Sequence, residues 1–491
     1  MTTYYTGDNP TKYLPFKELI AISHYIMPNF GTMSWDRVTR PQVNAALARF
    51  KDTNGALNDG MMMYIHVPYC QSFCHYCNFN KNHYPRQEQE QLEQYVDYLI
   101  KEIDWYVAQP YVQSRRFTAL YIGGGSPSTL PPSAVVRLFE HLKKVIPNHD
   151  TIEKTFTGEP RTLKRPELLQ AIKDFGWQRV TFGIETLNEK IHKQIGRRDT
   201  RTDIDEVFDG MAKVGFTGER CVDIMYDLPG QTYEGFREEL ATLVREYDPD
   251  EIDAFGTVYL PYRPLHKLII DGRVDQPGSI WSLLRMREHL YDFLLESGYN
   301  NVIAETYSKR TDRTQYQTAH CARQDIVGVG CAARGNVKDM VSINPADLDE
   351  WMKNIDEHGV STQTLQSIGR GGVLDRIMVM FPRYRELSKE LLHSFSDVSH
   401  FDRVLKTLAG HIEAGVVEDK GDRYVTNKLG TVWHGNLQTD YMRHVANVKL
   451  KMLLHVITEK EEQFDRPERF KVNVATKFIA KHTDKYPRLM K

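Results

Sequence analysis

The sequence lacks the features that would assign it to a membrane, secreted or nucleic-acid-binding class of protein. Its 491 residues contain no apolar run that approaches the ~20 residues needed to cross a bilayer. The first residues, MTTYYTGDNPTKYLPF, have no apolar signal core. A charge excess is also missing, because 63 basic residues stand against 65 acidic ones, for a net charge of −2. These absences predict a cytoplasmic protein that binds neither membranes nor nucleic acids.

Cysteine is scarce as well, but half of the six cysteines lie together. Cys70, Cys74 and Cys77 follow a mostly apolar run at 61–67, which predicts a buried strand that delivers a cysteine loop. Thiolates this close together in a cytoplasmic chain favour metal binding over disulfides. Three ligands are one fewer than a zinc site or a 4Fe–4S cluster requires, which leaves one metal position open for a small molecule. A zinc loop with a distant fourth ligand and a set of core thiols are the alternatives.

Strands and helices alternate after the cysteine loop. Apolar patterns predict strands at 117–122, 151–157, 179–183, 219–225 and 251–259, and helices at 87–108, 133–145, 166–175, 188–195, 204–214 and 233–246. Together with the first strand, they predict six βα units and a parallel sheet that is closed, or partly closed, as a barrel. Functional groups then belong at the carboxyl ends of the strands.

Glycines and charged residues are found at or near those strand ends. Glycines there allow a backbone to approach a ligand closely, although they also occur in ordinary loops. Carboxylates can accept hydrogen bonds from ribose hydroxyls, and arginine can pair with a carboxylate, although ordinary salt bridges are the alternative. The candidates are Gly124, Gly125, Ser126, Glu159, Glu185, Arg197 and Asp223.

The later part of the chain differs in composition. We expect a helix at 279–298, a short strand at 302–307, a helix around Trp351 and a linker at 366–372. A helix and a glycine-containing hairpin (416–418 and 423–425) then indicate a winged-helix-like α+β module, and balanced charge favours a lid or support over DNA binding. The predicted parts are a helical lead segment (1–60), the barrel (61–341), a helix and linker (342–372), a C-terminal domain (373–442) and a helical, then basic tail (443–491).

The cysteine motif resembles that of the radical S-adenosylmethionine (SAM) superfamily. Its flanks resemble the oxygen-independent coproporphyrinogen III oxidase branch, through Tyr64, the HVPY at 66–69 and Tyr76, as does the DIMYDLPGQT at 223–232. The resemblance implies a partial (β/α)6 barrel whose three cysteines hold three irons of a 4Fe–4S cluster. SAM would chelate the fourth iron, and one electron would cleave it to a 5′-deoxyadenosyl radical. Cys70, Cys74 and Cys77 would then be metal ligands and catalytic residues.

The resemblance also implies a set of SAM contacts. Glu185 departs from the family, which usually has Gln there, and can accept but not donate a hydrogen bond. Ala333 ends a GVGCAA segment that is similar to the family's segment near the second ligand. His320, Cys321 and Cys331 are either hydrogen donors or packing residues, and packing is favoured. The implied cofactor-binding residues are Tyr64, Tyr76, Gly124, Gly125, Ser126, Glu159, Glu185, Arg197, Asp223 and Ala333.

One difference between this sequence and the coproporphyrinogen oxidases bears on the expected reaction. The coproporphyrinogen oxidases carry a further cysteine two places after the third, where this chain has Phe79. We therefore expect a class C methyltransferase-type member that binds two SAM molecules and transfers a methyl or methylene carbon to an sp² carbon of an aromatic or tetrapyrrole substrate. Phe or Tyr at this place resembles the methyltransferase and cyclopropanase members, the anaerobic haem-degrading members and the haem chaperones. The implied electron donor is a flavodoxin or ferredoxin. The alternatives are a coproporphyrinogen III oxidase and a non-catalytic haem chaperone.

Overall fold

The fold is described from a computed structural model of the chain. The described residues are 60–77, 82–83, 89–259, 263–278, 280–310, 325–338, 340–362 and 364–442. The predicted lead segment (apart from Gly60), the tail, Phe79, His320 and Cys321 lie outside these ranges. Within these ranges, no helix combines the length and apolar character that a membrane span requires.

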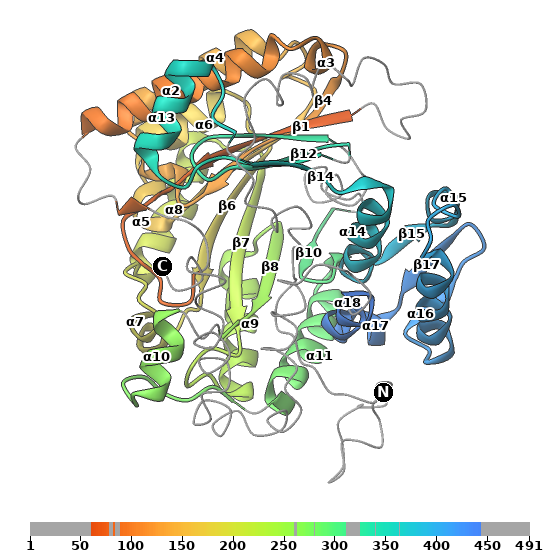
Figure 1. The fold of residues 1–491 in the computed structure, drawn as a ribbon. Helices are drawn as coiled ribbons and strands as arrows, with labels where there is room; N and C mark the ends of the chain where they lie inside the picture. Colours follow the sequence, from red (N-terminus) through yellow and green to blue (C-terminus); the bar gives the residue numbers. More distant parts are fainter. Residues whose placement is uncertain are drawn as a thin grey trace.

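A twelve-stranded sheet forms the centre of the molecule, in the order β14-β13-β12-β11-β1-β4-β5-β6-β7-β8-β10-β9. Its middle is a run of parallel strands, as the alternating pattern predicts: β1 (Gly60–Val67), β4 (Arg116–Gly124), β5 (Glu153–Gly158), β6 (Arg179–Glu185), β7 (Glu219–Tyr226) and β8 (Glu251–Gly256). β11 (Asp325–Val329) is parallel to β1 on its other side. The predicted partly closed barrel of six βα units is thus confirmed, and Figure 1 shows its curved sheet.

Antiparallel strands extend both edges of this sheet. On the β11 side they are β12 (Arg334–Val337), β13 (Met340–Ile343) and β14 (Thr364–Ser367). On the β8 side they are β10 (Thr306–Ser308) and β9 (Asn300–Ile303).

Helices connect the strands and cover the outer face of the sheet. They are α2 (Gln89–Val107), α3 (Pro110–Gln113), η3 (Pro127–Thr129), α4 (Pro132–Val145), α5 (Pro160–Leu163), α6 (Pro166–Asp174), α7 (Glu189–Gln194), α8 (Arg201–Val214), α9 (Tyr233–Tyr247), α10 (Pro264–Ile270), α11 (Ile280–Glu296) and α13 (Leu348–His358). Local signals set their ends. Thr200 and Asp203 form a capping box at the start of α8, and Thr232 caps α9 by accepting a hydrogen bond from Gly235 N.

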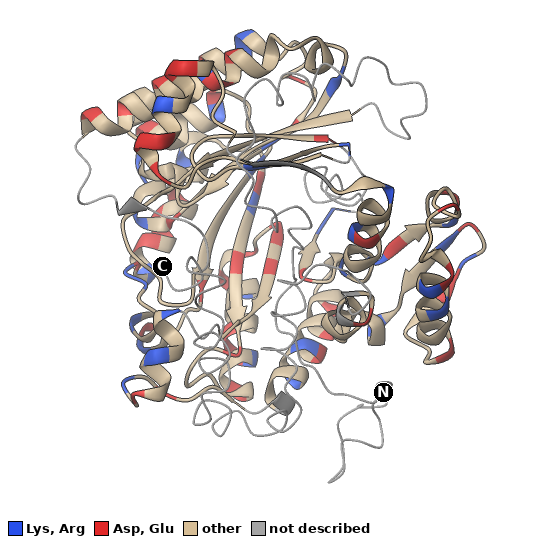
Figure 2. Ribbon diagram, viewed as in Figure 1, with Lys and Arg blue, Asp and Glu red and all other residues tan. Residues whose placement is uncertain are grey.

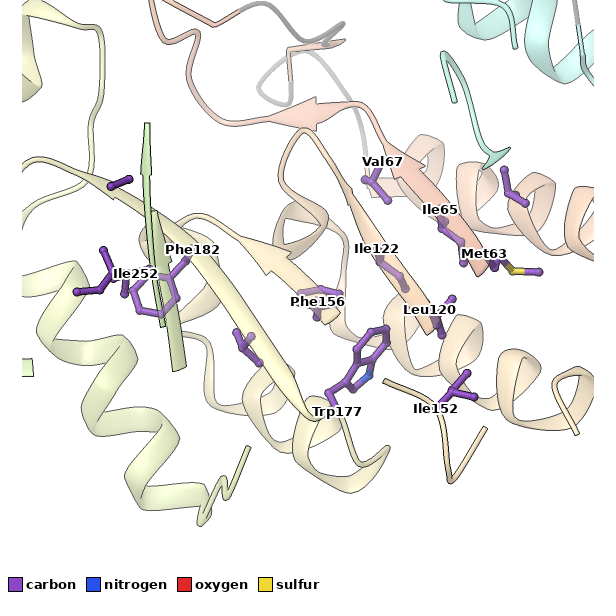
Figure 3. Packing of buried hydrophobic residues seen from close by; sticks show 14 of the residues in the cluster. Met63, Ile65, Val67, Leu120, Ile122, Ile152, Phe156, Trp177, Phe182 and Ile252 are labelled. Atoms are coloured by element: carbon purple, nitrogen blue, oxygen red, sulfur yellow. The ribbon is translucent and has the colours of Figure 1, made fainter. Parts of the chain in front are cut away.

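The core lies between the sheet and these helices. Figure 3 shows Met63, Ile65 and Val67 of β1 packed beside Leu120 and Ile122 of β4, and all five side chains are buried. Met62, on the other face of β1, is also fully buried, in a separate cluster with Ala119 and Ile326. Both faces of the first strand are therefore covered, which explains why its sequence is apolar almost throughout.

Two predicted segments differ from the structure. The single strand predicted at 302–307 is a hairpin of β9 and β10, because the Asn301 amide donates to both Ile303 O (2.6 Å) and Thr306 O (3.3 Å) across the turn. The predicted linker at 366–372 is wrong. It contains the end of β14, where Ser367 pairs with Met340 of β13, and the first turn of helix α14. β14 pairs with the edge strand β13, and α14 packs against α18 (His434–Met442). These tertiary contacts order the segment despite its glycine-rich composition.

The C-terminal part begins at α14 (Gly369–Tyr384). It continues through β15 (Glu386–Ser388), α15 (Lys389–His393), α16 (Phe401–Glu413), β16 (Val417–Asp419), β17 (Arg423–Thr426), α17 (Lys428–Val432) and α18 (His434–Met442). A helix followed by the β16–β17 hairpin agrees with the winged-helix-like expectation. The module (blue in Figure 1) lies beside α11, where the Arg287 guanidinium donates to Val432 O over 3.1 Å.

Candidate functional site

The cysteine loop leaves the carboxyl end of β1. The short β2 (Tyr69–Cys70) pairs in parallel with β3 (Asn82–His83), so Cys70 begins the loop from a fixed strand position. Cys77 N donates to Cys74 O over 3.2 Å, a turn that brings the second and third cysteines together. All three are free thiols, with Cys70 buried and the other two partly exposed.

The glycine loop after β4 packs against the backbone that leads to Cys70. Gly125 N donates to Val67 O (2.7 Å) and Ser126 N donates to Tyr69 O (2.7 Å). A Cβ added at Gly125 would lie 2.6 Å from Tyr69 O, so only glycine fits this approach. The Ser126 hydroxyl is 4.0 Å from the Cys70 sulfur. The glycine loop therefore fixes the cysteine stem, and its contact with SAM stays a prediction.

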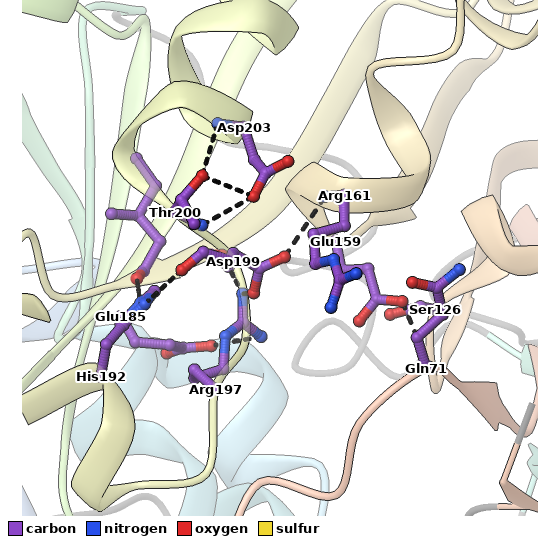
Figure 4. Close-up of polar contacts among 12 residues, drawn as sticks. Gln71, Ser126, Glu159, Arg161, Glu185, His192, Arg197, Asp199, Thr200 and Asp203 are labelled. Atoms are coloured by element: carbon purple, nitrogen blue, oxygen red, sulfur yellow. Dashed lines mark hydrogen bonds and ion pairs between the residues drawn. The ribbon is translucent and has the colours of Figure 1, made fainter. Parts of the chain in front are cut away.

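Glu159 and Gln71 connect the third strand end to the cysteine loop. Glu159 directly follows β5 and is 3% exposed, and its Oε1 accepts a hydrogen bond from Gln71 N over 3.3 Å (Figure 4). The structure thus brings Ser126 and Glu159 to the same side of the loop as Cys70.

Arg197 lies at the centre of a second group (Figure 4). Its guanidinium is 2.8 Å from Asp199 Oδ2 and 3.5 Å from Glu185 Oε1, and it donates to Gly183 O. Burial alone would lower the pKa of Arg197, but Asp199, Cys74 and Glu185 raise it well above its usual value. Arg197 is therefore charged at any physiological pH. Burial and the neighbouring Cys74 likewise raise the pKa of Tyr76, which keeps its phenol neutral.

Asp199 is a site residue that was not predicted, although the run from Gly196 to Asp199, GRRD, contains a signal. An acid two residues after an arginine can pair with it once the chain turns, but the sequence does not show that turn. Glu185 has a positive φ of 61°, a strained backbone that fits its place at a functional strand end.

Asp223 is a partly buried residue of β7, with two further carboxylates near it. Its Oδ1 accepts a hydrogen bond from Thr181 Oγ1 over 3.2 Å. Asp253 is its register partner on the neighbouring strand β8, and Thr306 Oγ1 donates to that side chain. Burial, then the negative charges of Asp253 and Glu185, raise the pKa of Asp223 well above its ordinary value. Asp253 is the second residue that the sequence analysis missed, because only strand register brings it beside Asp223.

Tyr64 and Ala333 belong to the β1–β11 side of the barrel. The Tyr64 hydroxyl is 2.9 Å from His66 Nδ1. Ala333 is buried in the turn after β11, and its carbonyl accepts from Asn344 N over 2.9 Å. Among the described residues, Ala333 makes backbone hydrogen bonds to Gly330 and Asn344 and none to the cysteine loop. Cys331 is fully buried, with its thiol 3.3 Å from Pro345 O, which supports a packing role.

Two side chains of α2 hold that same turn. Glu102 is fully buried and accepts five hydrogen bonds: from Gly330 N (2.8 Å), Asn344 Nδ2 (3.2 Å), Trp351 Nε1 (3.1 Å), Ser361 N (3.1 Å) and the Ser361 hydroxyl. Tyr95 donates to His66 O (2.7 Å) and accepts from Cys331 N (3.1 Å). The helix that follows the cysteine loop is therefore fastened to the turn after β11.

The amino-terminal end of the barrel has its own buried charge cluster. Arg179 contacts Glu251 and lies 3.4 Å from Glu219 and 3.7 Å from Glu153. The carboxylates of Glu219 and Glu251, with the Cys221 thiol, have metal-ligand spacing. Arg179 also lies 3.5 Å from the Cys221 sulfur, and Arg310 contacts Glu153 and Glu219. Because two cations already balance most of the negative charge, we interpret the cluster as structural.

Comparisons with known proteins agree with this geometry. Residues 64–243 match the radical SAM superfamily. The heme chaperone HemW of Buchnera aphidicola subsp. Schizaphis graminum is 25% identical over 76% of this chain and 96% of its own length. The oxygen-independent coproporphyrinogen III oxidase of Escherichia coli K12 is 24% identical over 73% of this chain and 80% of its own length. The anaerobilin synthase of E. coli O157:H7 is 26% identical over 60% of this chain and 65% of its own length.

A solved structure matches most of the fold. Coproporphyrinogen III oxidase (HemN) from E. coli superposes with a TM-score of 0.69 and 21% identity, over 86% of this chain and 96% of that one. The chain therefore carries a radical SAM domain, which the family match places at residues 64–243. The similarity in sequence and in fold to an oxygen-independent coproporphyrinogen III oxidase agrees with the resemblance of the cysteine flanks to that branch.

The cofactors of this superfamily are a 4Fe–4S cluster and SAM, and the residues present fit both. Three free thiols in one loop match the number of protein ligands that a 4Fe–4S cluster with one open iron needs. Among the described residues, buried Arg197 Nε and the hydroxyls of Thr155 and Thr157 on β5 have no hydrogen-bond partner. Buried polar groups without partners are costly, so they suit a polar ligand.

Proposed function

We propose that the protein is a methyltransferase-type radical SAM enzyme that binds two SAM molecules and transfers a methyl or methylene carbon to an sp² carbon of an aromatic or tetrapyrrole substrate. Phe79 is the reason to prefer methyl transfer to decarboxylation, because this residue occupies the position where the coproporphyrinogen oxidases have a further cysteine. The similarity to an anaerobilin synthase supports it.

Cys70, Cys74 and Cys77 would hold the cluster. When bound, the cluster and SAM supply reductive cleavage of a carbon–sulfur bond, and with it the ability to take a hydrogen atom from an unreactive C–H bond. The protein must hold the reacting groups in place and keep water out. The residues assigned to this binding are Tyr64, Tyr76, Gly124, Gly125, Ser126, Glu159, Glu185, Arg197, Asp223 and Ala333.

Each polar group has a role that follows from its surroundings. Arg197 is fixed by Asp199 and Glu185, so it can pair with a ligand carboxylate at little cost in side-chain entropy. Glu159 can accept a hydrogen bond from an amino or hydroxyl group. The raised pKa of Asp223 favours its neutral form, in which a carboxyl group donates as well as accepts hydrogen bonds.

Relatives suggest the substrate class. Their names refer to coproporphyrinogen III, anaerobilin and heme, so we infer a tetrapyrrole as the first substrate to test. The electron donor would be a flavodoxin- or ferredoxin-type protein. Two alternatives remain: oxidative decarboxylation of coproporphyrinogen, and a haem chaperone, which is favoured by the alignment with 96% of a heme chaperone HemW.

The experiment separates the three functions by their products. Anaerobically reconstituted protein is incubated with methyl-labelled SAM, a reductant and, in separate reactions, haem, coproporphyrinogen and an indole. Methyl transfer predicts a product that gains labelled carbon, whereas the oxidase predicts two losses of carbon dioxide. Haem binding without SAM turnover supports the chaperone. The Cys74→Ala variant is the control, and labelled product from that variant would overturn the proposal.

A further inference from the structure

The outer side of the cysteine loop exposes an aromatic side chain. Phe73, next to Cys74, is 48% exposed, and Ile270, the last residue of α10, is 42% exposed. They are two of the five exposed large hydrophobic residues among the described ranges. Single exposed apolar residues are ordinary, but apolar residues grouped on one surface indicate an interaction site.

Backbone contacts join the segments that carry these residues. His75 N donates to Ile195 O over 2.8 Å at the end of α7, and Leu265 N in α10 donates to His75 O over 3.0 Å. A Cβ added at Gly196 would lie 2.9 Å from Phe73 O. The loop 71–77, the segment 189–198 and the segment 264–273 therefore form one continuous surface, which is named the cysteine-loop face.

This face carries an excess of positive charge. Lys190 is neutralised by Asp275 at 2.6 Å, and Arg197 is buried. The remaining exposed acids of the face are Glu189 and Asp271. Four exposed cations outnumber them: Lys193, Arg198, Lys267 and Arg273. Figure 2 shows basic residues on α7 and α10, in a chain whose net charge is −2.

We propose that the cysteine-loop face docks an acidic one-electron carrier protein. The inference rests on the proposed function, because reductive SAM cleavage requires an electron from outside the chain. Transient protein interfaces combine apolar and charged residues, as the exposed residues of this face do, and opposite charges speed the encounter. Phe73 is covalently adjacent to Cys74, so a partner that covers Phe73 brings its redox group close to the cluster ligands. One electron leaves the reduced carrier and enters the cluster, and no atom is transferred.

The test reverses surface charges of the cysteine-loop face and leaves the cysteines and the proposed SAM-binding residues unchanged. Lys193→Glu/Lys267→Glu reverses two cations of the face. The matched control, Lys143→Glu/Lys144→Glu, reverses two exposed cations in the last turn of α4, far from α7 and α10 in Figure 1. Binding of an acidic flavodoxin and of a 2Fe–2S ferredoxin to the reconstituted full chain is measured by calorimetry at low and high ionic strength.

We expect about tenfold weaker carrier binding by the Lys193→Glu/Lys267→Glu protein at low ionic strength, and a much smaller difference in high salt, since salt screens surface charges. Ile270→Ser should weaken binding at both salt concentrations. The control should bind like the wild type. Equal binding by the wild type and both double variants, binding of neither carrier, or an equal loss in the control would overturn the proposal.

A second readout separates this inference from the proposed function. SAM cleavage driven by dithionite bypasses a protein donor and should be equal in the wild type and the three variants, whereas carrier-driven cleavage should fall with binding. If dithionite drives no cleavage in the wild type, the proposed function fails, while the binding data still decide the docking site. If the face variants lose affinity for the tetrapyrrole instead of the carrier, the cations serve the substrate and the docking proposal is wrong.

Discussion

Glu102→Ala should be among the most destabilising single substitutions in the barrel. The carboxylate accepts five hydrogen bonds in a fully buried position. Four of the five donors would lose their partner, because Asn344 Nδ2 also donates to Gly330 O; at about 1–3 kcal/mol each, this gives an upper bound of about 4–12 kcal/mol. Water entering the vacated space recovers part of that, and single substitutions rarely exceed about 5 kcal/mol, so we expect a loss of about 4 kcal/mol.

Urea unfolding followed by tryptophan fluorescence measures this loss. Trp351 is itself a donor to Glu102, so its emission reports on the affected region. The matched control is Asp97→Ala on the same helix, whose 59% exposed carboxylate pairs with Arg137 at 2.9 Å. An exposed pair contributes about 0–1 kcal/mol. If Glu102→Ala shifted the unfolding midpoint no further than Asp97→Ala, the structural role assigned to Glu102 would be refuted.

Four further predictions follow from the charges and ligands of the site. Burial raises the pKa of Glu102 above its usual 4.5. The contribution of Glu102 to the unfolding free energy is therefore full below about pH 4.5 and declines as the pH rises through the pKa of the folded state. If the stability advantage of the wild type over Glu102→Gln grew with pH, this prediction would be contradicted. Arg179→Ala should cost about 3–5 kcal/mol by leaving the buried Glu251 carboxylate without its cation, since Arg310 still contacts Glu153 and Glu219, and thermal unfolding should show a smaller deficit at acidic pH, where Glu251 is protonated. Asp199→Asn should weaken SAM binding about tenfold by releasing Arg197, measured by equilibrium dialysis against Asp205→Asn, and equal affinities would refute the positioning role. Cys74→Ala should lose the iron and the visible absorbance of the cluster while circular dichroism stays unchanged.

The sequence predicts the barrel well because its signals are local. Apolar runs, amphipathic spacing and helix caps such as Thr232 lie within a few residues of one another, and the structure confirms the strands and helices that they predict. The β9–β10 hairpin was missed because its turn depends on one side chain, Asn301, that bridges two carbonyls. The region 366–372 was misjudged because its pairing partner, β13, supplies the missing order.

Candidate site residues could be predicted from the sequence only where they belong to a motif or follow a predicted strand. The cysteine spacing and the strand-end rule led to Cys70, Glu159 and Arg197 from sequence alone. Asp253 and Glu102 have no such signal, because strand register brings one beside Asp223 and helix packing brings the other beside Gly330, 228 residues away. Contacts between distant parts of the chain are set by tertiary packing, which a single sequence does not display.

The attachment of α2 bears on what happens when oxygen destroys the metal centre. Tyr95 and Glu102 are two helical turns apart, on the same face of α2, and both are fastened to the turn after β11. The segment with the cysteines thus runs between a strand paired on both sides and a helix anchored at two points. Its scaffold does not depend on iron to stay in place. We therefore expect that protein stripped of its cluster keeps β1 and α2 in place and can be loaded again with iron and sulfide.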